Sequence, residues 1–269
     1  MRLSRCWIIA LLLFSGVLSA HADLYFGVFG DSQPGGDLQY PVLSAIAADM
    51  SGRRLSLVVG TGDYIDGSRQ ISTVRSQWPH FFKGIAPLQQ AGKVPVVLAP
   101  GNHDILGSRT CLEIFEGHFG PAYRSFSMDG CHFITLNTEE PGRHGRIVGE
   151  QWDWLRQDLA ATPNITPTFV FMHRPLYPVS IHVGEGMDEY PQQRDALHRL
   201  FVAEGVRCVF QGHEHLFNRQ FRDGVEYIIN GGGGGSLYAQ PAKGGFFHWV
   251  LVHVRDGRHS MQIRKISFK

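Results

Sequence analysis

The sequence has almost no excess of charge and no cluster of basic residues. Its 269 residues carry a formal net charge of +1, and no run of Lys or Arg appears along the chain. Proteins that track a nucleic-acid backbone do so with a basic stripe, so its absence argues against bulk nucleic-acid binding. The chain also lacks internal repeats and Pro/Gly/Ser-rich linkers, which favours a single domain around one substantial core.

Cysteine is scarce, with four residues and no C-x-x-C pair, so a thiolate zinc site is not supported. Cys6 lies in the N-terminal segment, and three cysteines lie beyond it, so at least one stays unpaired within the chain. Cys208 lies in an apolar run, which predicts a small buried core residue. Cys111 and Cys131 flank a segment that can close as a loop, and we expect them to form a disulfide in an oxidising compartment.

One apolar stretch near the N-terminus has the pattern of a targeting signal. Arg2 and Arg5 precede the apolar residues 7–18, and Ala20-His21-Ala22 comes after them. This is the charged, apolar and small-residue order of a secretory signal peptide. An uncleaved membrane anchor needs about 20 apolar residues, and this stretch is shorter. We therefore expect a cleaved signal peptide at 1–22, a mature domain at 23–269 with no transmembrane segment, and a periplasmic or secreted location.

Short apolar runs alternate with helix-like patterns through most of the chain. Buried strands are predicted at 24–29, 55–59, 94–99, 132–136, 168–172 and 206–210, and helical spacing appears at 42–50, 71–90, 150–160 and 194–203. We expect Pro79 and Pro87 to break or end the second helix. The runs 225–229, 246–254 and 260–267 predict three consecutive, antiparallel strands. The alternation indicates an α/β fold with layers around mixed sheets.

Polar residues come directly after several of these predicted strands. They are Asp31, Asp63, the run Asn102-His103-Asp104, His173 and the pair His213 and His215. Open α/β sheets bind ligands at the carboxyl ends of their strands, and these residue types are metal ligands. One such histidine alone is more often a hydrogen-bonded core or surface residue, so the inference depends on the joint pattern.

A pair of metal ions is the chemistry that this pattern favours. Two ions about 3.5 to 4 Å apart supply a nucleophilic hydroxide and positive charge for the hydrolysis of a phosphate ester. At least one ligand must reach both ions. A carboxylate has two charged oxygens, whereas a neutral imidazole has one lone-pair nitrogen, so Asp63 is the candidate bridge.

The order of these motifs resembles the calcineurin-like metallophosphoesterases. The matching segments are Gly30-Asp31-Ser32-Gln33, Gly62-Asp63, Gly101-Asn102-His103-Asp104, Met172-His173 and Gly212-His213-Glu214-His215. The resemblance extends from Asp31 to the glycine run 231–235. It implies an α/β fold that is a four-layer α/β/β/α sandwich with two mixed β-sheets, and hydrolysis of a small phosphorylated substrate.

The resemblance also implies a role for each matching residue. It assigns one metal to Asp31, Gln33, Asp63 and His215, and the other to Asp63, Asn102, His173 and His213. His103 would remain without a metal and face the substrate, where it stabilises the transition state or protonates the leaving alkoxide. Asp104 would fix the ring of His103. Glu214, between two ligands, is expected to point away.

Two positions depart from the family pattern. Gln33 stands where the family usually has His, and its amide oxygen is a weaker ligand, so we expect its metal to be held less tightly or with an extra water. Asp66 stands where the purple acid phosphatases have Tyr, so no tyrosinate-to-iron colour is expected. The mixed oxygen and nitrogen ligands suit divalent or trivalent Fe, Mn, Zn or Co, and the choice among them stays open.

Substrate contacts are less clearly indicated. Arg174 comes directly after His173 and can contact a phosphate or, equally, hold a loop carboxylate. The segments 143–146 and 182–190 are candidates for the pocket rim or are plain solvated loops. The glycine run 231–235 lacks the context of a dinucleotide site. It either lets the backbone pass close to the metals or forms a flexible loop.

The sequence therefore predicts an exported, metal-dependent phosphomonoesterase that uses a hydroxide bridging two metals as its nucleophile. A phosphodiesterase or nucleotide hydrolase with the same centre is the nearest alternative. A metal-binding protein that has lost catalysis through Gln33 is the alternative of another class. The natural substrate and the oligomeric state stay open.

Overall fold

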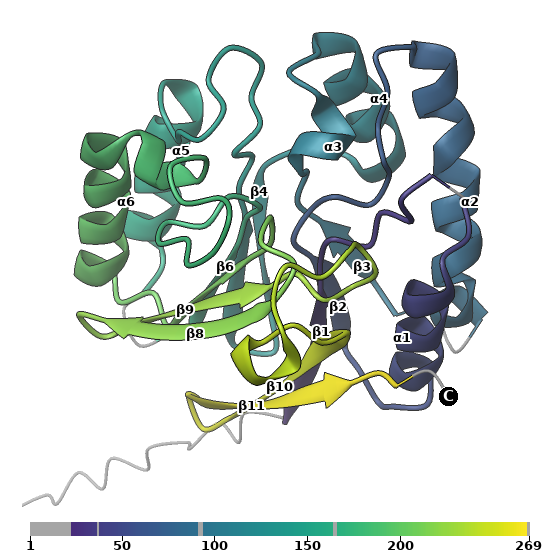
Figure 1. Cartoon of the computed structure of the whole chain (residues 1–269). Coiled ribbons are helices and arrows are strands. Elements are labelled where there is room, and N and C mark those ends of the chain that lie inside the picture. Colours follow the sequence, from purple (N-terminus) through teal and green to yellow (C-terminus); the bar gives the residue numbers. More distant parts are fainter. Residues whose placement is uncertain (1–22, 37, 91–93, 164–165, 268–269) are drawn as a thin grey trace, which may run out of the picture.

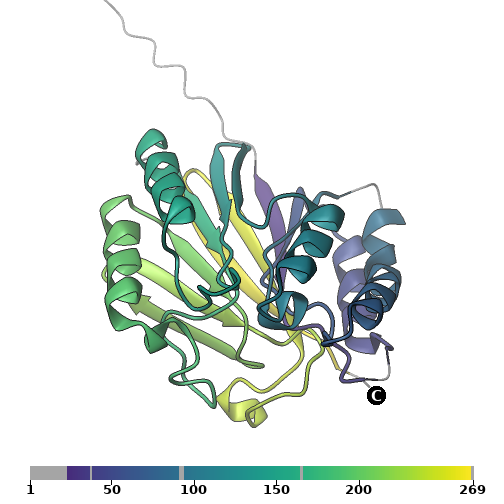
Figure 2. The same cartoon turned by 90° about the horizontal axis from the view of Figure 1, so that it is seen from above.

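The computed structural model describes residues 23–36, 38–90, 94–163 and 166–267, so the predicted signal peptide at 1–22 lies outside the described residues. Two β-sheets lie face to face, with helices on the outer side of each, as Figures 1 and 2 show. This arrangement confirms the expected α/β sandwich with two mixed sheets. No helix among the described residues is both long and apolar enough to cross a bilayer.

The first sheet has five strands in the order β11-β10-β1-β2-β3. Its parallel strands are β1 (Leu24–Phe29), β2 (Leu57–Gly60) and β3 (Val96–Leu98). The strands β10 (His248–Arg255) and β11 (Arg258–Lys265) extend it in antiparallel fashion. The helices α1 (Pro41–Ser51), α2 (Ile71–Gln90), α3 (Asn102–Ile105) and α4 (Arg109–Phe119) occur between and after its parallel strands along the chain.

The second sheet has six strands in the order β4-β5-β6-β7-β9-β8. Its four central strands are parallel: β5 (Cys131–Thr135), β6 (Thr168–Phe171), β7 (Cys208–Gln211) and β9 (Val225–Asn230). The edge strands β4 (Arg124–Met128) and β8 (Phe217–Arg222) are antiparallel to their neighbours. The helices α5 (Glu150–Ala161) and α6 (Pro191–Ala203) cover it, and short 3-10 turns lie at Met187–Glu189 (η1) and Pro241–Lys243 (η2).

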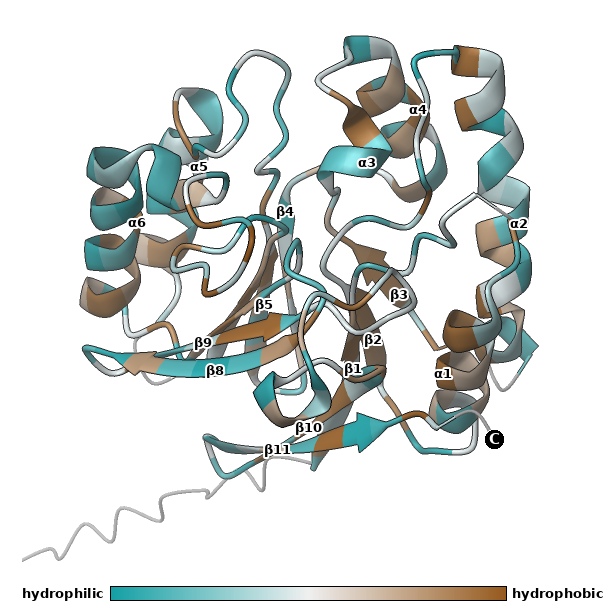
Figure 3. Cartoon of the chain, viewed as in Figure 1, coloured by the Kyte–Doolittle hydropathy of each residue, from teal (hydrophilic) through white to brown (hydrophobic). Residues whose placement is uncertain are grey.

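Three clusters of buried side chains fill the spaces between the four layers. The first lies between the first sheet and its helices, with Trp78 and Phe81 of α2 at its centre. The second lies between the two sheets, where Phe26 meets Phe133 and Phe169 edge to face. The third joins the second sheet to α5 and α6. Figure 3 shows the matching pattern, with hydrophobic residues on the central strands and hydrophilic residues along α6 and the edge strand β8.

The prediction that Pro79 and Pro87 break the second helix is wrong. Both prolines lie inside the continuous helix α2. A proline removes one backbone hydrogen bond of the helix. The buried side chains of Trp78, Phe81 and Ile85 fix this helix against the first core cluster, and this burial outweighs the lost bond.

The predicted disulfide between Cys111 and Cys131 is also wrong. Both cysteines are buried and free. Cys111 of α4 packs in the cluster under the helices, whereas Cys131 of β5 packs between the sheets. The two thiols therefore lie in different layers of the sandwich. Cys208 is fully buried, as predicted.

The predicted run of three consecutive antiparallel strands at the end of the chain is wrong in part. β9 lies in the second sheet and is parallel to β7, whereas β10 and β11 cross to the first sheet. The chain between β9 and β10 therefore passes from one sheet to the other. That crossing contains the glycine run 231–235.

Candidate metal centre

The predicted ligands follow the carboxyl ends of strands in both sheets, and their side chains come together where these strand ends adjoin. Asp31 lies just after β1, Asp63 after β2 and His213 after β7. All three have left-handed backbone, with φ of 58°, 58° and 70°. Such a conformation costs an L-residue about 1 to 2 kcal/mol. Backbone hydrogen bonds between loops, such as Asp31 N to the Gly62 carbonyl at 2.9 Å, hold these turns in place.

The side chains form two adjoining groups of candidate ligand atoms. In one group, Asp63, His173 and His213 each place an atom within 4.8 Å of the others. In the second group, Asp31, Asp63 and His215 do the same. Asp63 belongs to both groups, which is the position that a bridging carboxylate requires. These residues are nearly or completely buried.

The two amide ligands expected from the sequence reach the same centre. Asn102 Oδ1 lies 2.9 Å from His173 Nε2, and Gln33 Nε2 lies 3.1 Å from His215 Nε2. Three buried atoms of the predicted ligands, Asp31 Oδ2, Gln33 Oε1 and His213 Nε2, make no hydrogen bond within the described part of the chain. Buried polar atoms without partners are rare, and oxygen and nitrogen atoms facing one another are suited to a cation. The residues present therefore fit a metal pair.

The two acidic side chains at the centre differ in how far positive charge compensates their burial. Burial raises the pKa of Asp31 to about 8, and the nearby charge of Asp63 adds to this increase. Burial also acts to raise the pKa of Asp63, but the adjacent His173 outweighs it and holds that pKa well below its ordinary value. A buried carboxylate that resists ionisation is one that a bound cation would stabilise.

The histidines at the centre divide into two kinds. Burial lowers the pKa of His213 well below its ordinary range, and burial lowers that of His215 to about 4. Both rings are therefore neutral near pH 7 and keep a lone pair for a metal. Burial also acts to lower the pKa of His173, but the adjacent charge of Asp63 outweighs it and raises this pKa to about 10. His173 Nε2 is 3.3 Å from Asp63 Oδ2, so the charged ring of His173 forms an ion pair with the candidate bridging carboxylate.

The glycine run 231–235 packs directly on this centre. Gly233 and Gly235 donate backbone hydrogen bonds to the carbonyls of Gly30 and Asp31, each at 2.8 Å. A Cβ at Gly235 would lie 2.5 Å from the ring of His215. Of the two interpretations of the run, the structure therefore favours close passage of the backbone past the ligands.

The expectation that Asp104 fixes the ring of His103 is wrong. Asp104 is buried, and its Oδ2 accepts hydrogen bonds from the backbone of Asp63 and Gly101, while its Oδ1 accepts from Tyr64 and Ile65. The ring of His103 instead has Nδ1 2.8 Å from the carbonyl oxygen of Asp66. Asp104 thus organises the loop that carries the bridging carboxylate. Burial and the charge of Asp63 raise its pKa to about 7, although the backbone donors act in the opposite direction.

The side chain of Asp66 makes contacts of its own, apart from the backbone contact with His103. Its two carboxylate oxygens accept hydrogen bonds from the backbone of Gly35 and Gly36, each at 2.8 Å. Asp66 therefore ties the loop after β2 to the loop after β1.

Two further residues have clear structural contacts. Glu214 points away from the ligands on either side of it, since its carboxylate accepts hydrogen bonds from the backbone of Val179 and Ser180. Arg174 is largely buried and pairs through Nε and Nη2 with the carboxylate of Glu139, and its Nη1 donates to the carbonyl of Glu185. In this structure Arg174 has the second of its two expected roles, that of holding a loop carboxylate.

Two aromatic side chains beside the ligands were not singled out from the sequence. His182 places its ring centroid 4.2 Å from that of His213, and its Nδ1 is 2.8 Å from Glu185 Oε2. His182, Glu185 and His213 also bring one candidate ligand atom each within 4.8 Å of one another. Tyr238 stacks on His215 at 4.1 Å. Only the general expectation of a rim at 182–190 pointed to His182, and no local pattern pointed to Tyr238.

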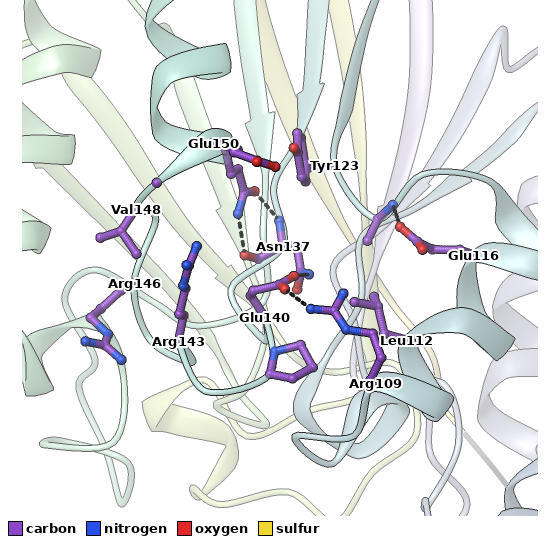
Figure 4. A pocket seen from close by; sticks show the side chains of 14 residues that line it. Arg109, Leu112, Glu116, Tyr123, Asn137, Glu140, Arg143, Arg146, Val148 and Glu150 are labelled. Atoms are coloured by element: carbon purple, nitrogen blue, oxygen red, sulfur yellow. Dashed lines mark hydrogen bonds and ion pairs between the residues drawn. The ribbon is translucent and has the colours of Figure 1, made fainter.

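A charged cavity of about 490 Å³ lies beside the loop after β5 and the start of α4 (Figure 4). Arg143 and Arg146 of the predicted rim line it. Arg109 donates to Glu140 at 2.7 Å, and the guanidinium of Arg146 lies over the ring of Tyr190. Its lining also includes three glutamates, so the cavity carries both signs of charge.

Comparison with known proteins gives consistent results. The model of the calcineurin-like phosphoesterase family matches residues 24–217. The chain is 30% identical over 176 residues to a probable cyclic nucleotide phosphodiesterase of Rhodococcus erythropolis, covering 65% of this chain and 55% of that protein. It is 35% identical over 133 residues to the human serine/threonine-protein phosphatase CPPED1, covering 45% of this chain and 42% of that protein. The chain spans about half the length of the curated relatives that it matches.

Two solved structures show the same fold. A purple acid phosphatase from yellow lupin seeds superposes with a TM-score of 0.73 at 21% identity, covering 91% of this chain and 52% of that chain. A dimetal phosphatase from Danio rerio superposes with a TM-score of 0.65 at 18% identity, covering 90% of this chain and 96% of that chain.

Proposed function

The chain belongs to the calcineurin-like phosphoesterase family, and we propose that it is a metal-dependent phosphomonoesterase. The observation that carries this proposal is the pair of buried ligand groups that share Asp63. One ion would be held by Asp31, Gln33, Asp63 and His215, and the other by Asp63, Asn102, His173 and His213. Bound ions of this kind supply Lewis acidity and a deprotonated water near neutral pH. Fe, Mn, Zn and Co all suit these ligands.

His103 is the residue that we assign to proton transfer. Its Nδ1 lies 2.8 Å from the Asp66 carbonyl, which accepts a hydrogen bond from Nδ1–H and leaves Nε2 available for the substrate. Burial lowers the pKa of His103, but Asp63 outweighs it and raises the pKa above its ordinary value. The raised pKa favours the protonated ring, in which Nε2 carries a proton that it can donate to the leaving alkoxide.

His182 is the second imidazole at the substrate side. Glu185 holds its Nδ1 at 2.8 Å and the ring rests on His213, so its position is determined from two directions. An imidazole in this place can hydrogen-bond to a phosphate oxygen. Arg174 is engaged by Glu139, and we assign it the support of the loop beside His173.

The test uses the mature protein and separates metal binding from turnover. Asp63→Ala and His213→Ala should lose metal, measured by elemental analysis, together with hydrolysis of p-nitrophenyl phosphate. His103→Ala should keep its metal content and lose turnover by about 10²-fold to 10⁴-fold, the usual contribution of a general acid. Full activity in His103→Ala would contradict its role, and full activity in Asp63→Ala would contradict the metal centre.

A phosphodiesterase is the second candidate, because the matched protein of Rhodococcus erythropolis bears that name. Comparison of bis(p-nitrophenyl) phosphate with p-nitrophenyl phosphate separates the two activities. Faster turnover of the diester would replace the proposed monoesterase. Metal-loaded protein that hydrolyses neither ester would favour the binding protein without catalysis.

We also propose that the protein is exported and acts in the periplasm or outside the cell. The support is the pattern of Arg2, Arg5, the apolar residues 7–18 and the small residues after them. N-terminal sequencing of the protein made in its native cell should begin at Asp23. A chain that retains its first 22 residues would contradict cleavage.

A further inference from the structure

A second cavity, of about 860 Å³, shares the wall residue Tyr238 with the metal centre. Tyr238 lines it and also stacks on His215, with ring centroids 4.1 Å apart. Val179 and Ser180 line it as well, and their backbone N–H groups bind Glu214, the residue between His213 and His215. Through Tyr238 the cavity therefore lies next to the His215 side of the centre.

The lining of this cavity combines apolar and aromatic side chains with several polar ones. It includes Val179, Leu216, Phe217, Tyr238, Ala239, Pro241, Ala242 and Phe246. Among its described lining residues there is no Asp or Glu, and the cations are Arg219 and Lys243. The cavity in Figure 4 differs, since three arginines and three glutamates line it. Pockets with apolar walls and a few polar groups are the kind that bind organic molecules.

The loop beside the cavity adds to this apolar surface. Val179, Ile181 and Val183 are 44%, 63% and 62% exposed. The residue between the last two is His182, whose ring lies on His213. Three exposed aliphatic side chains in five residues form a local apolar patch, and His182 joins this patch to the ligand His213.

We propose that this cavity binds the alcohol part of the phosphate ester and selects esters whose alcohol carries a large, planar, apolar group. The proposal rests on the phosphoesterase activity proposed above. The planar preference comes from the aromatic walls, because Phe217 and Phe246 lie 25° from parallel and Tyr238 adds a third ring. Aromatic side chains bind flat rings by stacking or edge-to-face contact.

The test compares ethyl phosphate with 2-phenylethyl phosphate. Both esters release a primary alcohol of similar basicity, so a difference in kcat/KM reports contacts of the ring rather than the chemistry of the leaving group. The wild-type protein should prefer 2-phenylethyl phosphate by about tenfold or more, since burial of a phenyl ring contributes at least this much. Equal kcat/KM values for the two esters would overturn the proposal.

A variant of the cavity wall locates the preference. Ala242 is exposed, so Ala242→Asp should fold, and its carboxylate would lie where the ring is expected. This variant should lose the preference and keep wild-type kcat/KM on ethyl phosphate. The matched control is Phe221→Asp, which changes a 73% exposed apolar residue on the same strand as Phe217 but outside the cavity, and it should keep the preference. An equal loss on both esters in Ala242→Asp would overturn the proposal.

The two proposals fail in distinguishable ways. If metal-loaded protein hydrolyses neither ester, the proposed activity is wrong. The cavity is then tested by calorimetry with 2-phenylethylphosphonate and ethylphosphonate, which are not cleaved. Tighter binding of the phenylethyl compound that Ala242→Asp removes would support the cavity, and equal binding would overturn it.

Discussion

Replacement of Asp104 by Asn should destabilise the metal-free protein strongly, although Asp104 is not a predicted ligand. Its Oδ2 accepts hydrogen bonds from the backbone of Asp63 at 2.9 Å and of Gly101 at 2.8 Å. In Asn one of the two oxygens becomes an NH₂ group, which cannot accept a hydrogen bond. If the amide oxygen of the new Asn side chain faced Tyr64, its NH₂ group would face the buried backbone N–H groups of Asp63 and Gly101, which are also donors. Each such group left unsatisfied costs about 1 to 3 kcal/mol, so the loss should be about 2 to 6 kcal/mol.

Thermal unfolding in the presence of a chelator measures this loss without the effect of bound metal. For a domain of this size 1 kcal/mol corresponds to roughly 2 to 4 °C, so Tm should fall on the order of 10 °C. His103→Ala serves as the control and should change Tm by only a few degrees, since one partly buried contact is removed. If Asp104 instead acts through the ring of His103, Asp104→Asn would unfold like the wild type and lose turnover alone. That result would refute the assignment of Asp104 to the backbone.

Three further perturbations test other parts of the structure. Burial acts to raise the pKa of Glu226, but His259 and Arg219 outweigh it and hold this pKa below its ordinary value. A carboxyl group whose pKa is lower in the folded than in the unfolded protein stabilises the fold at pH values above its unfolded pKa. This stability is lost as the pH falls through the folded pKa. The Tm of the wild type should therefore fall more steeply than that of Glu226→Gln below about pH 5, and parallel curves would contradict this. Gly101→Ala should lose metal, because its Cβ would lie 2.2 Å from Asp63 Oδ1, whereas Gly117→Ala, where a Cβ meets nothing within 4 Å, should keep it. Denatured mature protein should titrate three thiols without reductant, and a single thiol would restore the predicted disulfide.

The central parts of the fold were predictable because buried parallel strands are short, continuous apolar runs. The prediction for 24–29 matches β1 at both ends, and the strand ends indicated where Asp31 and Asp63 would emerge. The edge strands β4 and β8 were missed, since their sequences mix arginine, serine and glutamine with single aromatic residues. One face of an edge strand is only partly buried, so its pattern is weak.

The contacts around the ligands were less predictable because they depend on loop conformation. Asp104 has the sequence position of a partner for the neighbouring His103, yet its carboxylate turns to backbone that lies 41 and 40 residues away in the chain. Tyr238 reaches His215 only because the chain crosses from one sheet to the other after β9. Neither contact can be inferred from periodicity or from a local motif.

The left-handed turns at Asp31, Asp63 and His213 have a consequence for the life of the molecule before it acquires metal. Glycine would relieve the unfavourable torsion angles at these positions, but it would remove the coordinating atoms. The empty protein therefore retains three unfavourable turns and a set of like-charged or unpaired groups, and a bound ion offsets them. We therefore expect proteases to cut the metal-free protein faster than the metal-loaded protein.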